Sequence, residues 1–277
     1  MKVVRSLLTQ SRVGDALGRL PYLPQLYASH FWRKRMNLYF GLYGSFEEAQ
    51  DTAQRFGKST WDDDRLAELI VHDTPDASNG GLSTFQISYY PYILWMTKIL
   101  QPGNQVIDLG GAGGIGFELL SRYSQIPEGV RWHVVDLPAL TARGRKRHGA
   151  NHPVLSFGET LDEAPDCDIL VSAGCIQYMR DPLGDIKRLL DRPKSPVHIV
   201  LNKVPLTAGA SYWTIQNHMS VVSPYRIFDR EELLGFFREH GYAIRDEWTA
   251  PDVWVDIPFH SGKSLDHTNG FLLSRVH

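Results

Sequence analysis

A glycine-rich turn between two apolar segments constrains the fold of this chain more than any other feature. Residues 105–109 contain Val106, Ile107 and Leu109, an apolar run typical of a buried strand. The turn follows at residues 110–116, and residues 117–123 place apolar side chains at helical spacing. Glycines let a backbone approach a ligand closely, and a helix N-terminus offers unpaired N–H groups. The segment therefore predicts a strand, a turn and a helix that together bind a nucleotide-like cofactor.

The glycine spacing fits more than one cofactor. Gly111, Gly113 and Gly116 match the dinucleotide fingerprint G-x-G-x-x-G. Asp108 favours another interpretation, because a carboxylate just before the turn would repel a pyrophosphate at the helix N-terminus. S-adenosylmethionine (SAM) has no phosphate and carries an ammonium and a sulfonium, so a carboxylate suits it. We therefore predict a SAM site; a dinucleotide site and a turn without a ligand are the alternatives.

A second acidic residue ends the next apolar run. Residues 131–136 read Arg-Trp-His-Val-Val-Asp, and Asp136 follows Asp108 at a distance that leaves room for a helix and a return. An acidic residue at the end of a second strand accepts hydrogen bonds from ribose hydroxyls. Asp136 is therefore predicted to hold the ribose of the cofactor.

These two segments resemble the class I SAM-dependent methyltransferases. Asp108-x-Gly110-x-Ala112-x-Gly114 is similar to their first motif, with Ala112 in place of the usual middle glycine. Asp136-Leu137-Pro138 is similar to the Asp-Leu-Pro of many small-molecule O-methyltransferases. The resemblance implies an α/β, Rossmann-like fold with a mostly parallel seven-stranded sheet and helices on both faces.

The chain divides by pattern into two parts. Residues 1–103 look mainly helical and are expected to form an N-terminal cap or lid, with helices over 5–20, 61–70 and 84–100. Residues 104–277 alternate strands and helices, as a parallel α/β sheet does, and are expected to form the SAM-binding domain, with a substrate-side insertion near 205–228. We expect strands near 105–109, 132–136, 154–157, 167–173, 197–203, 242–248 and 270–276, and helices near 114–123, 139–148, 182–191 and 230–240.

Ligands of open α/β sheets lie at the carboxyl ends of the strands, which ranks the candidate site residues. The predicted cofactor-binding residues follow the first four strands: Asp108, Gly110, Gly111, Ala112, Gly113, Asp136, Leu137, Glu159, Thr160, Ser172 and Ala173. The predicted catalytic residues are Gln177, Tyr178, Asn217 and His218, of which His218 has an ordinary pKa suited to a general base. Aromatic side chains at 39, 40, 43, 85, 89, 90 and 92 are candidates to close over the sulfonium.

A narrower resemblance joins several pieces between residues 37 and 275. Residues 39–49, the glycine motif, 176–182, 215–217 and 224–228 resemble a bacterial family of proteins assigned as methyltransferases, most of which lack known substrates. The same pieces are similar to enzymes that use SAM as their only substrate and close its aminobutyrate part into azetidine-2-carboxylate, releasing methylthioadenosine. The resemblance thus implies methyl transfer to a small molecule in bacterial secondary or glycan metabolism, or SAM cyclisation; a non-catalytic SAM-binding protein is the third alternative.

The overall totals fit this interpretation. A net charge of −2 gives no reason to expect a nucleic-acid partner, and no apolar run approaches the ~20 residues of a membrane span. Cys167 and Cys175 lie in one apolar segment without metal-site spacing, so we expect no metal, no disulfide and a reducing, cytoplasmic location. The predicted partners are a small-molecule substrate or SAM alone, and a homodimer is a candidate assembly.

Overall fold

The computed structural model describes most of the chain as two compact units. The described residues are 9, 11–20, 22–33, 38–57, 61–72, 87–149, 152–218 and 221–276. Unit 1 combines residues 1–61, 205–231 and 253–268, and unit 2 combines residues 62–204, 232–252 and 269–277. Each unit is therefore built from three stretches that are distant in the sequence.

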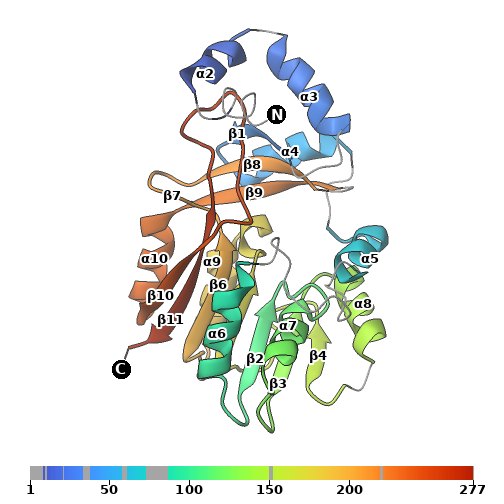
Figure 1. Ribbon diagram of the computed structural model, residues 1–277, viewed down its shortest axis with the longest axis vertical. Helices are drawn as coiled ribbons and strands as arrows, with labels where there is room; N and C mark the ends of the chain where they lie inside the picture. Colours follow the sequence, from blue (N-terminus) through green and yellow to red (C-terminus); the bar gives the residue numbers. More distant parts are fainter. Residues whose placement is uncertain are drawn as a thin grey trace. The chain divides into compact units, whose positions relative to one another are not determined.

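Unit 2 is built on a seven-stranded sheet with the order β10-β11-β6-β5-β2-β3-β4 (Figure 1). Strands β4, β3, β2, β5 and β6 run parallel, and β11 pairs antiparallel with β6. The strand bounds are β2 Gln105–Leu109, β3 Arg131–Val135, β4 Leu155–Gly158, β5 Ile169–Ala173, β6 His198–Val204, β10 Tyr242–Ala250 and β11 Thr268–Arg275. This order and direction confirm the predicted mostly parallel seven-stranded sheet.

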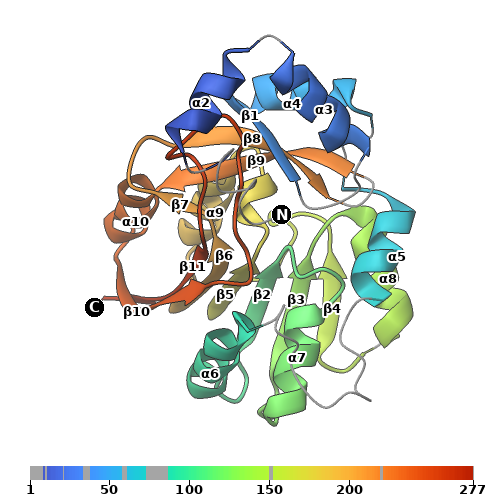
Figure 2. The same cartoon turned by 45° about the horizontal axis from the view of Figure 1, so that its top comes forward.

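Helices cover both faces of this sheet (Figures 1 and 2). Their bounds are α5 Asp64–His72, α6 Tyr89–Ile99, α7 Ile115–Tyr123, α8 Pro138–His148, α9 Pro182–Leu190 and α10 Arg230–Glu239. The apolar faces of α6 and α7 bury Tyr92, Met96 and Phe117 against Trp132 and Val134 of β3. That packing holds the carboxyl ends of β2 and β3 in fixed positions.

Unit 1 is a smaller mixed layer. Its sheet has the order β1-β8-β9-β7, with β1 Leu38–Tyr43, β7 Leu206–Thr207, β8 Tyr212–His218 and β9 Val221–Asp229. The strands β1, β8 and β9 pair antiparallel, whereas β7 pairs parallel with β9. Helices α2 Arg12–Gly18, α3 Leu23–Arg33 and α4 Phe46–Arg55 accompany the sheet, and Phe31, Ala49 and Ile215 lie in its core.

The predicted elements of unit 2 agree with the structure to within a few residues. Two features differ from the sequence analysis. β1 is a strand within a region expected to be mainly helical; its run of Tyr39, Phe40 and Tyr43 suits a pleated, half-buried surface. The units also divide the chain differently from the predicted boundary at residue 103, because α6 packs into the core of unit 2 while residues 253–268 join unit 1.

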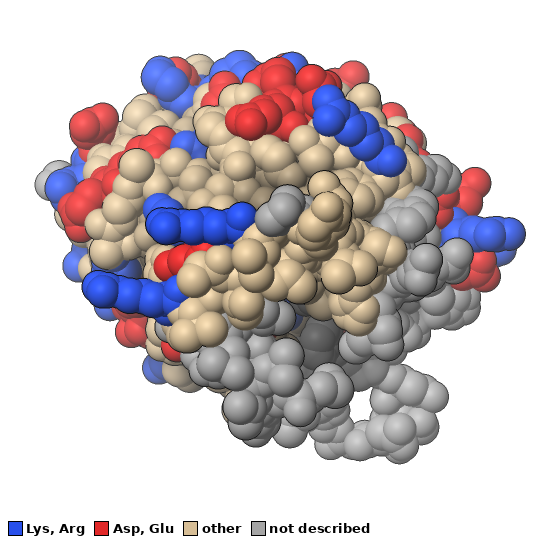
Figure 3. All heavy atoms as spheres, turned by 90° about the horizontal axis from the view of Figure 1, so that it is seen from above, with Lys and Arg blue, Asp and Glu red and all other residues tan. Residues whose placement is uncertain are grey.

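Several predictions fall on residues that the structure does not describe. The start of the first expected helix, at 5–8, lies outside the described residues, as do Phe85 and the start of the helix expected over 84–100. Among the described residues, no helix is long and apolar enough to cross a membrane. On the face shown in Figure 3, basic and acidic side chains are interspersed.

Candidate cofactor and substrate site

The glycine turn joins β2 to α7 through backbone conformations that few residues adopt. Gly110 and Ala112 have φ of 72° and 47°, in the left-handed region. A Cβ on Gly110 would lie 2.2 Å from the Cβ of Cys175, so glycine is required there by the chain's own packing. Ala112 is the one turn residue that carries a side chain at a left-handed φ, and the resemblance had placed it where a glycine is usual.

Asp136 fastens this turn to the end of β3. Its Oδ2 accepts a hydrogen bond from the Ala112 N–H at 2.7 Å, and its Oδ1 accepts one from the Leu137 N–H at 2.8 Å. Burial raises the pKa of the Asp136 carboxyl to about 6, while these two hydrogen bonds lower it. Each carboxylate oxygen has a second lone pair, so the group is oriented and can still accept hydroxyl donors.

Asp108 lies beneath the turn, in the core. Its side chain is 2% exposed, and its Oδ2 accepts a hydrogen bond from the indole N–H of Trp132 at 3.1 Å. Burial raises the pKa of this carboxyl to about 7; the Trp132 hydrogen bond lowers it and the nearby Asp136 raises it. The carboxylate therefore supports the underside of the turn, and its predicted contact with the cofactor's ammonium stays a prediction.

The remaining predicted cofactor residues lie at the same edge of the sheet. Glu159 and Thr160 follow β4 and are exposed, and Leu137, which caps α8, is 38% exposed. Ser172 is buried in β5, where its hydroxyl donates to the Leu109 carbonyl at 3.0 Å and ties β5 to β2. Ala173 ends β5. All of the predicted cofactor residues thus belong to unit 2 and cluster at the carboxyl ends of β2, β3, β4 and β5.

The catalytic candidates after β5 occupy a short 3-10 helix at Ile176–Tyr178. Gln177 is 3% exposed, and its Oε1 has no hydrogen-bond partner among the described residues. Buried polar atoms are normally paired, so such an atom indicates a missing donor. Gly174 lies beside it: a Cβ there would be 3.9 Å from the Gln177 amide nitrogen and 3.8 Å from the Cβ of Lys203. Gln177 and Lys203 therefore flank the same end of β5.

A buried polar network continues from Lys203 along the end of β6. The Lys203 ammonium lies 3.6 Å from Asp252 Oδ2 and 4.4 Å from the ring centre of Tyr89. Lys203 also has a φ of 59°, an unusual conformation for a residue with a long side chain. Asp252 Oδ2 accepts from the Ser88 hydroxyl at 2.7 Å, whereas the buried Oδ1 has no partner among the described residues.

Two further residues complete this network. The Asn202 amide donates to the Ser88 carbonyl at 3.2 Å and accepts from the Trp248 indole N–H at 3.0 Å. The sequence analysis did not single out Ser88, Trp248 or Asp252 as site residues. Their chain positions are far apart, and the tertiary placement of β10 and of the segment before α6 brings them together.

The other two catalytic candidates lie in unit 1, at the end of β8. The Asn217 side chain is buried and donates a hydrogen bond to the Phe31 carbonyl. The His218 ring stacks on Trp61 with 5.5 Å between centroids, and burial lowers its pKa. These contacts give both side chains a role in packing unit 1. Their catalytic roles stay predictions.

The aromatic candidates are likewise divided between the units. In unit 1, Tyr39 is buried and accepts a hydrogen bond from the Gln216 amide at 3.0 Å, and Phe40 stacks on Tyr27. In unit 2, Tyr92 is fully buried, while Tyr90 is 51% exposed. Of these candidates, Tyr89 contacts the polar network after β6, with its ring centre 4.4 Å from the Lys203 ammonium.

The residues at the turn fit a nucleoside-containing cofactor. A left-handed glycine turn, a helix N-terminus and an oriented carboxylate at the end of the adjacent strand form the donor and acceptor set that a nucleoside requires. No group of three or more His, Cys, Asp or Glu side chains that could hold a metal ion occurs among the described residues.

Two solved structures with a similar fold are assigned as methyltransferases. The chain is similar to a protein from Galdieria sulphuraria assigned as a sarcosine dimethylglycine methyltransferase, with 14% identity over 78% of this chain and 98% of that one, and a TM-score of 0.50. It is also similar to a protein from Listeria monocytogenes assigned as a SAM-dependent methyltransferase, with 8% identity, coverage of 69% and 99%, and a TM-score of 0.50. No protein-family model and no curated protein sequence matches the chain. The predicted fold of the class I SAM-dependent methyltransferases is confirmed.

Proposed function

We propose that this protein is a SAM-dependent methyltransferase acting on a small-molecule acceptor. The observation that carries the proposal is the Asp136 carboxylate, which is hydrogen-bonded to Ala112 of the left-handed turn at the carboxyl edge of the sheet. Bound SAM would supply an electrophilic methyl group on a sulfonium. The resemblance of residues 39–49 and 176–182 to a bacterial family favours an acceptor from bacterial secondary or glycan metabolism.

The residues of unit 2 divide into two roles. Asp136 would accept the ribose hydroxyls, and the turn N–H groups would contact the cofactor. Gln177 Oε1 and Asp252 Oδ1 are buried acceptors for which the described residues offer no donor, and a hydroxyl or amine of the methyl acceptor would satisfy them. The Asp252 carboxylate, paired with Lys203, would take the proton that this nucleophile loses.

The cofactor assignment is tested by calorimetry with SAM and with adenosine. Asp136→Ala removes hydrogen bonds to a charged acceptor, so both ligands should bind more weakly by about 1.5–3 kcal/mol, roughly tenfold or more. Asp162→Ala is the matched control, because that carboxylate is 69% exposed on the surface of the same unit. Equal affinities for wild type and Asp136→Ala would contradict the proposal.

The acceptor side is tested by kinetics after an acceptor has been found in a metabolite extract by the appearance of S-adenosylhomocysteine. Asp252→Asn should lower kcat by about 10²–10⁴-fold, the usual worth of a general base, and leave the affinity for SAM unchanged. A loss of SAM affinity without a loss of kcat would assign Asp252 to cofactor binding instead.

SAM cyclisation is the second candidate function, and the burial of Asp108 favours it. Cyclisation requires a neutral α-amine that attacks the γ-carbon, with the γ-carbon–sulfur bond breaking and methylthioadenosine leaving. Asp108 is buried against Trp132 and burial raises its pKa to about 7, and a neutral Asp108 would not hold the α-amine as an ammonium. Incubation with SAM alone separates the candidates: methylthioadenosine with a cyclic C4 amino acid identifies the cyclase, and unchanged SAM excludes it. Tight SAM binding without turnover in either assay would instead identify a non-catalytic binding protein.

A further inference from the structure

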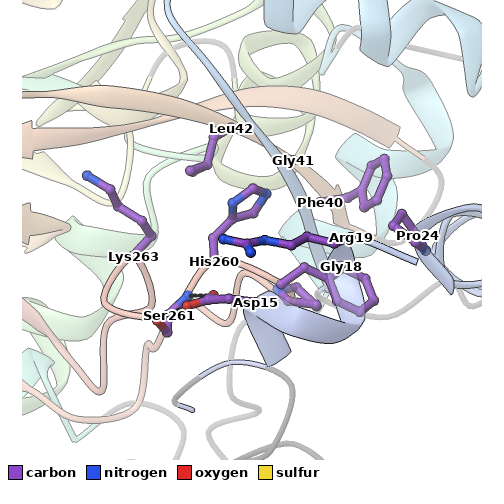
Figure 4. Close-up of a pocket in the computed structure, with 12 residues that line it drawn as sticks. Asp15, Gly18, Arg19, Pro24, Phe40, Gly41, Leu42, His260, Ser261 and Lys263 are labelled. Atoms are coloured by element: carbon purple, nitrogen blue, oxygen red, sulfur yellow. Dashed lines mark hydrogen bonds between the residues drawn. The ribbon is translucent and has the colours of Figure 1, made fainter. Parts of the chain in front are cut away.

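Unit 1 contains a cavity of its own, with a volume of about 550 Å³ (Figure 4). Four segments line it: the C-terminal end of α2, Pro24 of α3, residues 40–42 of β1, and the loop 258–263. Ligand sites commonly have volumes of roughly 300–1,000 Å³ and combine apolar walls with a few polar groups. Every lining residue belongs to unit 1, so this cavity is independent of the residues assigned to SAM.

The charged side chains of the cavity leave a surplus of positive charge. Among the described residues, Asp15 is the one carboxylate that lines the cavity, and it accepts hydrogen bonds from the Ser261 N–H at 2.7 Å and from the Ser261 hydroxyl. Those hydrogen bonds, above all, lower the pKa of Asp15. Arg19 and Lys263 also line the cavity and outnumber the Asp15 carboxylate. His260 lines it too, but burial lowers the pKa of its ring, so it is not counted among the cations. Figure 4 shows the Arg19 side chain extending toward His260. The Lys263 ammonium lies 4.6 Å from the ring centre of Tyr212.

Aromatic side chains form the apolar walls of the cavity. Phe40 and Phe259 line the cavity, and Tyr27 contacts both rings, stacked on Phe40 at 5.9 Å and edge-on to Phe259 at 5.8 Å. Phe259 has a φ of 68°, a strained conformation for a bulky residue. A Cβ on Gly18 would lie 2.7 Å from the Phe259 Cβ, so glycine is needed for this approach. Strain of this kind is concentrated at ligand clamps, since surrounding structure must maintain it.

We infer that this cavity binds a small organic anion, a carboxylate carried on a flat apolar body. The planar Arg19 guanidinium matches a carboxylate in a two-point hydrogen bond, and Lys263 is a second cation that lines the cavity. The rings of Phe40 and Phe259 provide the flat apolar contact. Asp15 is oriented by its two hydrogen bonds to Ser261, and the charge of Arg19 also lowers its pKa, so Arg19 and Lys263 together leave one positive charge for a bound anion.

Three probes of one shape test the charge preference: benzoate, benzyl alcohol and benzylamine, titrated into the full-length protein by ligand-observed NMR. Benzoate should bind about tenfold more tightly than benzyl alcohol, the usual worth of a charge-assisted hydrogen bond, and benzylamine should bind most weakly. Equal binding of the three probes, or a preference for the amine, would overturn the inference. This comparison uses the unaltered chain, so it does not depend on whether a variant folds.

Variants then locate the site. Arg19→Gln should abolish the preference for benzoate and leave benzyl alcohol binding unchanged, whereas Arg12→Gln, an exposed arginine of the same helix outside the cavity, should change neither. Leu42→Trp should fill the cavity and weaken both probes. Benzoate binding that persists in Arg19→Gln and in Leu42→Trp would place the anion elsewhere and refute the inference. SAM affinity, measured in parallel, should be unchanged in all of these variants.

Discussion

At the scale of single residues, two carboxylates support the glycine turn in different ways. Asp136 is partly buried and accepts two backbone N–H groups, so its orientation is fixed by the turn that it serves. Asp108 is buried in the core and accepts from the indole of Trp132. In the proposed function, Asp136 would contact the cofactor, and Asp108 would support the backbone of the turn. Both have raised pKa values because burial penalises their charge.

Gly111 gives a residue-scale prediction. A Cβ at this position would lie 2.6 Å from the carboxyl carbon of Asp108, a buried group held by the Trp132 indole. Gly111→Ala should therefore destabilise the protein by about 1–3 kcal/mol through overpacking, measured as the free energy of unfolding in urea.

Gly235 provides the matched control for that substitution. It lies within α10, and a Cβ there would meet nothing within 4 Å. Gly235→Ala should be neutral or stabilise by about 0.4–1 kcal/mol, because alanine restricts the unfolded chain and favours helix. Equal stabilities of the two variants would refute the close approach of Gly111 to Asp108.

At the scale of elements, α4 begins with reciprocal side-chain caps. Ser45 Oγ accepts from the Glu48 N–H at 3.1 Å, and Glu48 Oε2 accepts from the Gly44 N–H at 2.9 Å. Ser45→Ala should cost about 0.5–2 kcal/mol of unfolding free energy, the usual worth of a helix N-cap.

The control for the cap is Ser121, in the interior of α7. Its hydroxyl bonds only the carbonyl one turn back, that of Phe117, at 2.8 Å. Ser121→Ala should have no measurable cost, since alanine is the better helix former. If both serine variants lose the same stability in urea, the cap is not what stabilises α4.

The same scale shows what the sequence could predict. The apolar runs of β2, β3, β5 and β6 and the turn after β2 are local patterns, and the structure agrees with them. The local sequence did not predict β1, because its six residues become a strand through pairing with β8, far along the chain. Asp252 was missed for a related reason: nothing near it in the sequence marks it, and only tertiary packing brings it to Lys203 and Ser88.

At the scale of the molecule, the strand order explains why the candidate residues of unit 2 gather where they do. From β2 the chain continues to β3 and β4 on one side, and then crosses to β5 and β6 on the other. Ligands of such sheets bind at the carboxyl ends of the strands where this reversal occurs. The turn after β2 meets Cys175 after β5 at this point, which is why Gly110 has no room for a Cβ.

The two carboxylates at the glycine turn make the stability of the whole protein depend on pH. The Asp108 pKa rises from 3.8 to about 7 on folding, chiefly because of burial. Between these values the folded protein binds more protons than the unfolded chain, so this carboxyl lowers stability as pH rises from about 4 to about 7. Asp136, with a pKa of about 6, acts in the same direction.

Asp108→Asn isolates this contribution, because an amide keeps the shape and does not titrate. The free energy of unfolding of the variant, minus that of wild type, should be larger at about pH 8 than at about pH 5, by up to a few kcal/mol. Asp162→Asn, with its exposed carboxyl, should follow the wild-type curve. Parallel curves for wild type and Asp108→Asn would mean that Asp108 stays ionised beneath the turn. If the free energy of unfolding falls more steeply with rising pH in wild type than in Asp108→Asn, the burial that places Asp108 beneath the glycine turn also penalises its charge.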